Sequence, residues 1–370
     1  MSVPTTQKAV VIEGDKAVVK TDISVPELKE GTVLVKVEAV AGNPTDWKHI
    51  AYKIGPEGSI LGCDIAGTVV KLGPNVSTDL KVGDTGFGFV HGASQTDPKN
   101  GAFAEYARVY PPLFYKSNLT HSTADEISEG PVKNFESAAS LPVSLTTAGV
   151  SLCYHLGSKM EWHPSTPQHT HPLLIWGGAT AVGQQLIQVA RHINAYTKIV
   201  AVASIKHEKL LKSYGADDVF DYHDAGVIEQ IKSKYPNLQH VIDAVGSEDS
   251  IPEAYKVTAD DLPATLLGVV PMTIENIPEE IRKDNVKIDI TLLYRASGEE
   301  ILLGATRLPA SPEYHEATIK FVNFINPHVN NGDIHHMNIK VFSNGLDDVP
   351  ALTEGIKEGK NKNVKYVARL

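Results

Sequence analysis

The chain has 370 residues, of which 42% are hydrophobic and 21% charged, and it carries a net charge of −10 at pH 7. This length favours two domains over one, and the acidic balance argues against nucleic acid or an anionic membrane as the main partner. No apolar run reaches the roughly 18 residues that span a bilayer, and the N-terminus has no signal-peptide pattern. We therefore expect a cytoplasmic protein. The two cysteines, Cys63 and Cys153, exclude a disulfide framework and a cysteine-rich zinc lobe.

The first 140 residues or so are predicted to be rich in β-strand, because short β-type runs alternate with turns. The predicted strands cover residues 9–12, 33–40, 66–73, 81–90 and 101–107. From about residue 143 to 297, strands alternate with helices, which indicates a parallel α/β unit. Its strands are predicted at 173–176, 198–204, 219–222 and 240–246, with a helix over 208–215 that ends at Gly215. Two further helices are predicted over 312–324 and 349–358, around a run at 337–342.

The most informative segment is the glycine turn between the strand at 173–176 and the next helix. Small residues at such a turn let the backbone approach a pyrophosphate, whose charge then lies at the helix N-terminus. The last glycine stands five residues after Gly178, so the spacing departs from the strict Rossmann pattern. A plain tight turn is the alternative. The candidate nucleotide-binding residues of the turn are Gly178, Ala179, Thr180, Ala181, Val182 and Gly183.

The end of the following strand indicates which nucleotide binds. NAD-preferring proteins carry an acid there, bonded to the 2′-hydroxyl of the ribose. This chain instead has Ser204, followed two residues later by Lys206. Because these side chains suit a phosphate better than a diol, we expect NADPH rather than NADH.

Several motifs together resemble the medium-chain dehydrogenase/reductase superfamily over essentially the whole chain. They are AGNPTDWK at 41–48, LGCDIAGTV at 61–69, LKVGD at 80–84, LPVSLTTA at 141–148 and the glycine turn. The chain resembles most the zinc-independent quinone and enoyl reductases, including fungal trans-acting enoyl reductases and yeast alcohol dehydrogenase-like aldehyde reductases. The resemblance implies a GroES-like, β-rich catalytic domain made of residues 1–142 and 298–370. It also implies a Rossmann domain with a doubly wound parallel sheet at 143–297, and a substrate cleft at the junction.

One departure bears on metal chemistry. Zinc-dependent relatives place a cysteine where Asn43 stands, and Gly-His-Glu where this chain has Gly-Cys-Asp at 62–64. A neutral amide is a poor zinc ligand, so we expect no metal in the catalytic site. A makeshift site of Cys63 and Asp64 with His49 or His91 is the alternative. A second set of histidines is predicted to lie in exposed loops without a metal: His169, His171, His335 and His336.

Hydride transfer needs donors for the charge that develops on the substrate. Asn43, Thr45 and Lys48 are candidate catalytic residues in a segment that follows a strand end. The resembled enoyl reductases carry a lysine in a matching motif, which implies that Lys48 is the electrophile or proton source, and Tyr52 is a candidate proton donor. The alternatives are a solvated lysine and a packed aromatic ring. We interpret Asp46 as the cap of a helix that begins near residue 47.

The resemblance also implies the remaining cofactor contacts. Thr147 matches a threonine at the nicotinamide end, although it fits a helix threonine bonded to its own backbone equally well. Lys206 and Tyr222 match residues that hold the 2′-phosphate and the adenine. The residues under the nicotinamide half are Val245, Gly246 and Leu267.

We therefore expect an NADPH-dependent, zinc-independent reductase that transfers hydride to small aldehydes, α,β-unsaturated carbonyls or quinones. One alternative is a zinc-type alcohol dehydrogenase, which Asn43 and Cys63 disfavour. Another is a catalytically silent relative of crystallin type that senses the cofactor or binds RNA. Residues 291–294 resemble an edge strand through which many relatives form dimers, whereas the enoyl reductases of polyketide synthesis are monomers. A monomer and a homodimer both stay open.

Overall fold

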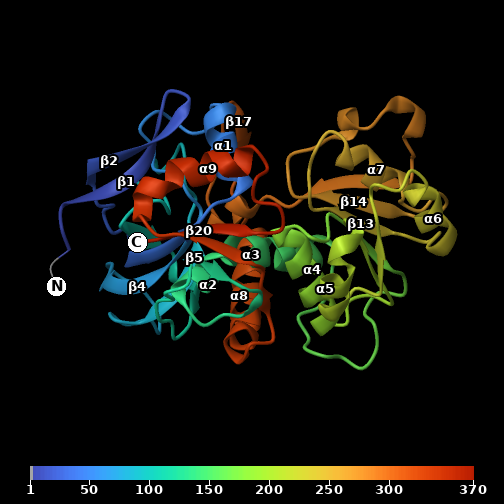
Figure 1. Ribbon diagram of the computed structural model, residues 1–370, viewed down its shortest axis with the longest axis horizontal. Helices are drawn as coiled ribbons and strands as arrows, with labels where there is room; N and C mark the ends of the chain where they lie inside the picture. Colours follow the sequence, from blue (N-terminus) through green and yellow to red (C-terminus); the bar gives the residue numbers. More distant parts are fainter. Residues whose placement is uncertain (1–2) are drawn as a thin grey trace. The chain divides into compact units, whose positions relative to one another are not determined.

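The computed structural model describes residues 3–370. The chain divides into two compact units, one made of Met1–Val143 and Tyr294–Leu370 and the other of Ser144–Leu293. Both ends of the sequence therefore build the first unit, and the second is one continuous segment (Figure 1). Within residues 3–370, no helix has both the length and the apolar character needed to cross a membrane.

An eight-stranded sheet forms the framework of the first unit, in the order β7-β5-β4-β3-β20-β19-β8, with β6 also paired to β3. Its strands are β3 (Val33–Ala41), β4 (Asp64–Leu72), β5 (Thr85–Phe89), β6 (Tyr106–Val109), β7 (Phe114–Lys116), β8 (Glu126–Ile127), β19 (Ile339–Phe342) and β20 (Lys365–Arg369). The last strand of the chain, β20, lies antiparallel to β3, with Val367 opposite Ala41. This pairing places the start of β20 beside the residues that follow β3.

Smaller elements surround this sheet. The strand pairs are β1 (Thr6–Glu13) with β2 (Lys16–Ser24), β9 (Gly130–Pro131) with β18 (His335–His336), and β16 (Ile301–Leu303) with β17 (Thr306–Leu308). The helices are α1 (Pro44–Ala51), α2 (Phe135–Ala139), α8 (Pro312–Asn331) and α9 (Val349–Lys357), with short 3-10 turns at Pro111–Leu113, Leu293–Ser297 and Gly345–Asp348. Apolar residues of β3, such as Val33 and Val35, share one core with Leu352 and Ile356 of α9. That core fixes α9 against the sheet.

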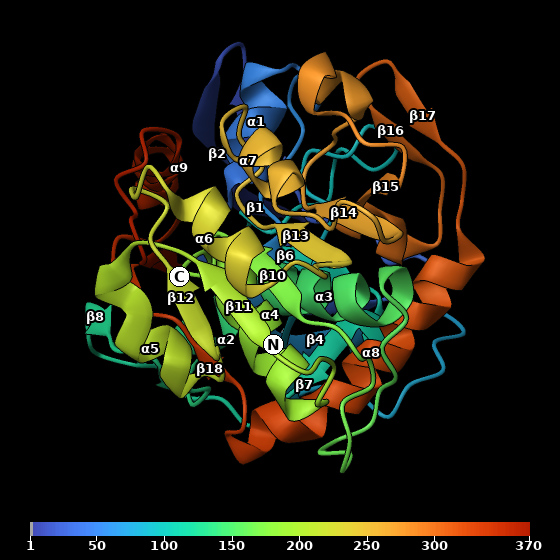
Figure 2. The same cartoon turned by 90° about the vertical axis from the view of Figure 1, so that its right-hand side faces the viewer.

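The second unit is built on six parallel strands in the order β12-β11-β10-β13-β14-β15. Figure 2 faces this unit and shows the strands side by side. They are β10 (Leu173–Trp176), β11 (Ile199–Val202), β12 (Asp218–Phe220), β13 (His240–Asp243), β14 (Ala264–Gly268) and β15 (Val286–Ile290). The helices are α3 (Pro142–Val150), which begins in the first unit and continues as a π-helical turn at Ser151–His155, α4 (Ala181–His192), α5 (Glu208–Ser213), α6 (Val227–Lys234) and α7 (Ser250–Lys256). Short 3-10 turns lie at Ile205–His207, Ile274–Asn276 and Glu279–Ile281.

Three expectations about elements were wrong. The parallel sheet has β12 at one edge and β15 at the other, whereas residues 291–294 lead into a 3-10 turn. Lys287 and Asp289 alternate with apolar residues in β15, which is the pattern of a half-buried strand, and the sequence prediction missed it. The strand predicted at 101–107 begins only at Tyr106. Helix α8, predicted over 312–324, continues through Pro327, a residue that normally disrupts a helix, to Gly332, whose φ of 84° ends it.

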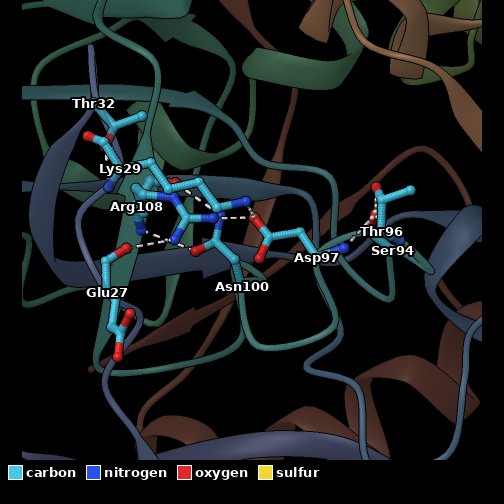
Figure 3. Close-up of polar contacts among 8 residues, drawn as sticks. All are labelled: Glu27, Lys29, Thr32, Ser94, Thr96, Asp97, Asn100 and Arg108. Atoms are coloured by element: carbon cyan, nitrogen blue, oxygen red, sulfur yellow. Dashed lines mark hydrogen bonds and ion pairs between the residues drawn. The ribbon is translucent and has the colours of Figure 1, made fainter.

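A polar cluster anchors the loop between β5 and β6 (Figure 3). The buried guanidinium of Arg108 pairs with the Asp97 carboxylate and donates to the backbone carbonyl of Glu27 at 2.5 Å. The Asn100 amide bonds both backbone polar groups of Arg108, at 2.9 and 3.0 Å. Lys29 adds a second cation 3.3 Å from Asp97. Since a buried charge needs a partner, the cluster ties this loop to β6.

Candidate functional site

The second unit contains a narrow glycine turn between β10 and α4. Gly177 has a φ of 87°, a conformation that favours glycine. A Cβ on Gly183 would lie 2.2 Å from the carbonyl oxygen of Gly177, so only hydrogen fits there. The Thr180 hydroxyl accepts a hydrogen bond from the Gly183 N–H at 3.0 Å and caps α4. The turn therefore fits a pyrophosphate, because its backbone is open to approach and the positive end of α4 begins there.

A second turn, after β13, lies against the glycine turn. A Cβ on Gly177 would meet the Val245 side chain at 2.5 Å, so these two predicted regions are neighbours. The buried Asp243 carboxylate accepts hydrogen bonds from the N–H groups of Val245 and Gly246, at 2.9 and 3.2 Å. Sequence reasoning gave Asp243 no role, although an acid at a buried strand end was the available signal. Leu267 is fully buried within β14.

The residues predicted to hold the ribose end of the nucleotide are accessible. Lys206 is exposed, Tyr222 is 52% exposed and Ser204 is half-buried at the end of β11. An acid that the sequence did not point to also lies here, since the Asp221 carboxylate accepts from the Ile205 N–H at 3.1 Å. Hydrogen bonds from the His223 and Ile205 N–H groups lower the pKa of Asp221. Asp221 is therefore ionised. It lies beside the strand end at Ser204, where the sequence has no acid.

Thr147, the predicted contact of the nicotinamide end, lies in α3 and is 5% exposed. It belongs to the same unit as the glycine turn. A buried Thr147 fits both a contact to the nicotinamide end and a helix threonine bonded to its own backbone.

In the first unit, a buried polar group joins β3, β4 and β20. Asn43 donates to the Asp64 carboxylate at 2.7 Å and accepts from the Lys365 ammonium at 2.6 Å. Lys365 also donates to Asp64 at 3.1 Å, and the other Asp64 oxygen accepts from the Val143 N–H at 2.7 Å. Burial raises the pKa of Asp64, and Lys365 and Asn43 oppose this increase. Both polar ends of the Asn43 amide are thus occupied by protein groups. Lys365 was missed because it lies some 320 residues away in the sequence.

Helix α1 begins at Pro44, three residues earlier than expected, with Asn43 as its N-cap residue. The Asp46 carboxylate does cap it, accepting from the Asn43 N–H at 2.6 Å, but from the third helical position. Within residues 3–370 the other Asp46 oxygen is buried without a hydrogen-bond partner. Burial raises the pKa of Asp46 to about 8, and the Asn43 N–H opposes this effect. Asp46 is therefore largely protonated near neutral pH.

A chain of polar side chains continues from α1 to Tyr294. The Thr45 hydroxyl bonds the Tyr294 hydroxyl and lies 3.2 Å from Nδ1 of His49. The His91 ring stacks on the Tyr294 ring with centroids 4.0 Å apart, and the Cys63 sulfur lies 4.0 Å from the Tyr294 hydroxyl. Burial raises the pKa values of Cys63 and Tyr294 and lowers that of His91 to about 3, so all three are neutral. Tyr294 was missed because its segment was interpreted as a strand.

The makeshift zinc set does not assemble in this arrangement. Within residues 3–370, one set of at least three His, Cys, Asp or Glu side chains has ligating atoms within 4.8 Å of one another, and it is His169, His171 and His240. Cys63, His49 and His91 are outside it. The expectation of exposed loops was wrong for His171 and His336, which are both buried.

Lys48 and Tyr52 lie one turn apart along α1. Lys48 is half-buried, and burial lowers its pKa. Its ammonium is 5.7 Å from the centre of the Trp47 ring. Tyr52 is 65% exposed at the end of the helix. Thr45, three residues before Lys48, lies on the same side of the helix. This side presents a hydroxyl, an ammonium and a phenol.

Both units of the chain are similar in sequence to known protein families. Residues 29–116 match the family of alcohol dehydrogenase GroES-like domains, and residues 181–303 match the family of zinc-binding dehydrogenases. The uncharacterized protein YNL134C of Saccharomyces cerevisiae is 55% identical over 372 residues, which cover 100% of this chain and 99% of that protein. The trans-enoyl reductase ACTTS2 of Alternaria alternata is 30% identical over 365 residues, which cover 99% of each chain.

A solved structure shows the same fold over nearly the whole length. The putative NADPH:quinone reductase from Bacillus thuringiensis superposes with a TM-score of 0.68 at 19% identity, and the match covers 98% of each chain. The likenesses therefore extend through both units.

Proposed function

Since the chain belongs to the medium-chain dehydrogenase/reductase superfamily and is a reductase, we propose that it reduces small α,β-unsaturated carbonyls, aldehydes or quinones with NADPH and without a catalytic zinc. The observation that carries this proposal is the polar side of α1, which offers proton donors in a superfamily where hydride comes from a bound nicotinamide. A 30% identical relative named as a trans-enoyl reductase supports the C=C bond as the target.

NADPH supplies the hydride when bound. In the second unit, the glycine turn holds the pyrophosphate, and Ser204 and Lys206 bind the 2′-phosphate as donor and cation. Asp243 positions the Val245–Gly246 turn through its two backbone hydrogen bonds. The ionised Asp221 carboxylate repels the 2′-phosphate of NADPH at short range, and the Lys206 ammonium attracts it. A preference for NADPH over NADH would therefore depend on Lys206.

In the first unit, Lys48 is the proton donor of the proposal. A lysine whose pKa is lowered by burial gives up its proton more readily near neutral pH than a solvated one. The Thr45 hydroxyl, held by Tyr294, donates to the oxygen on which negative charge develops. Asn43 is a positioning residue, because its amide is bound to Asp64 and Lys365.

The test of the function is product analysis with a medium-chain 2-alkenal, which offers a C=C and a C=O bond to the same hydride. Protein treated with a chelator is mixed with the alkenal and NADPH, and in parallel with NADH. A saturated aldehyde identifies an enoyl reductase, and an allylic alcohol identifies a carbonyl reductase. Cofactor binding without turnover on enals, aldehydes or quinones would contradict the proposal and favour a silent relative. A loss of kcat in chelator-treated protein that is still folded and still binds NADPH, restored by zinc, would contradict the zinc-independent mechanism.

The Lys48→Met variant should lose about 100-fold in kcat at unchanged cofactor affinity, because general acid catalysis contributes at least that factor. Lys48→Arg keeps the charge but not an acid that releases its proton near neutral pH, so it should not restore the rate. The wild-type rate should fall as pH rises through the lowered pKa of Lys48. Steady-state kinetics against pH check these outcomes.

The matched control is Lys71→Met, an exposed lysine in the same unit. It should keep the wild-type kcat. A Lys48→Arg variant with full activity would show that only the positive charge matters and would exclude Lys48 as the proton donor.

A further inference from the structure

Three histidines meet at the end of the parallel sheet where the strands begin. The glycine turn lies at the opposite end. His240 is the first residue of β13, and His171 stands two residues before β10, its neighbour in the sheet. His169 is fixed by its own backbone, which bridges Tyr196 and donates to the Ala195 carbonyl at 2.8 Å. Because the strands are parallel, their amino ends lie at one end of the sheet, and the glycine turn lies at their carboxyl ends. The cluster is separate from the proposed reductase site.

The three side chains are arranged as metal ligands are. One nitrogen of each imidazole lies within 4.8 Å of one nitrogen of both others. The rings are centred 4.6 to 5.4 Å apart. Zn–N bonds of about 2.0–2.1 Å at tetrahedral angles place ligand nitrogens roughly 3.3 Å apart. Small rotations of the rings would close the remaining distance.

Each imidazole is also held through its second nitrogen. Nδ1 of His171 lies 3.1 Å from the Pro172 carbonyl, which only accepts, so this nitrogen carries the proton and Nε2 has the lone pair. Nε2 of His169 contacts the Ser158 hydroxyl at 3.1 Å, and Nδ1 of His240 contacts the Tyr196 hydroxyl at 2.8 Å. Metal-binding histidines are oriented in this way, with the ring nitrogen that does not bind the metal fixed by an oxygen.

We propose that His169, His171 and His240 bind one divalent transition-metal ion, zinc by preference, through Nδ1 of His169 and Nε2 of the other two. Three imidazoles suit zinc, and a water completes the tetrahedron. His169 and His240 are half-buried, so the ion has access from solvent. The metal joins the segment before β10 to the start of β13. It stabilises the nucleotide-binding unit without taking part in hydride transfer.

The test uses untagged, chelator-treated full-length protein titrated with zinc chloride by calorimetry, and with cobalt chloride by absorption. We expect one ion per chain and the intense visible bands of tetrahedral cobalt. Zinc at a hundredfold excess over its Kd should raise Tm by about 5 °C. His171→Gln and His240→Gln should each weaken binding by on the order of 100-fold. Tyr196→Phe keeps all three ligands and should weaken binding about tenfold.

The matched control is His163→Gln, an exposed histidine in the segment that leads to β10. It should bind zinc as the wild type does. NADPH affinity and near-UV circular dichroism verify that each variant is folded. Binding far from one ion per chain, an octahedral cobalt spectrum, or unchanged affinity in a folded His240→Gln or Tyr196→Phe variant would overturn the site.

Discussion

Replacing Gly183 with valine is expected to abolish cofactor binding. A Cβ at this position would lie 2.2 Å from the Gly177 carbonyl oxygen and 2.9 Å from backbone atoms of Gly178. Neither neighbour is a flexible side chain, so the turn itself must open and α4 must move from β10. We expect Kd for NADPH to rise at least ~1000-fold, a loss of about 4.1 kcal/mol. Titration of NADPH fluorescence measures it.

Gly226→Ala is the control for this substitution. Gly226 precedes α6 in the same unit, and the nearest atoms to a Cβ there lie 3.6 and 3.7 Å away, both on polar side chains. Its cofactor affinity should equal that of the wild type. A folded Gly183→Val variant that binds NADPH with wild-type affinity would show that the glycine turn is only a tight connection.

The Asp46→Asn variant should remove a pH dependence of stability. Burial raises the pKa of Asp46 from 3.8 to about 8, so the folded protein holds a proton that the unfolded chain releases. Its contribution to stability is complete below pH ~4 and is lost as pH rises through about 8. One pH unit corresponds to 1.36 kcal/mol. From pH 5 to pH 8, the variant should therefore gain on the order of 4 kcal/mol relative to the wild type, measured by urea unfolding.

Asp84→Asn is the control, because the pKa of Asp84 is lowered in the folded protein whereas that of Asp46 is raised. A hydrogen bond from Lys116 lowers the pKa of Asp84, so its contribution is present above the unfolded pKa and is lost only in acid. The difference between this variant and the wild type should be constant from pH 5 to pH 8. A parallel dependence in Asp46→Asn and the wild type would show that Asp46 is ionised in the folded protein.

Local pattern was enough to predict the parts of the fold in which short-range chemistry decides the structure. The glycine turn is predictable because Gly177 and Gly183 leave no room for side chains where strand and helix meet. The helix that ends before Gly215, whose φ is 114°, follows the same logic. The full length of α8 was not predictable, because Pro327 opposes a helix and tertiary contacts override that local preference. Strand β15 was missed although its alternation of apolar and charged residues is a strand pattern.

Motifs whose members are neighbours in the chain were sufficient to predict the superfamily, the two kinds of fold and the position of the glycine turn. What Asn43 binds depends instead on the folded arrangement, because Asp64 and Lys365 reach it through the pairing of β3 with β4 and β20. The same holds for His240, which joins His169 and His171 only because β13 lies beside β10. Parallel strands bring together the ends of distant segments, and no local pattern records which ends will meet.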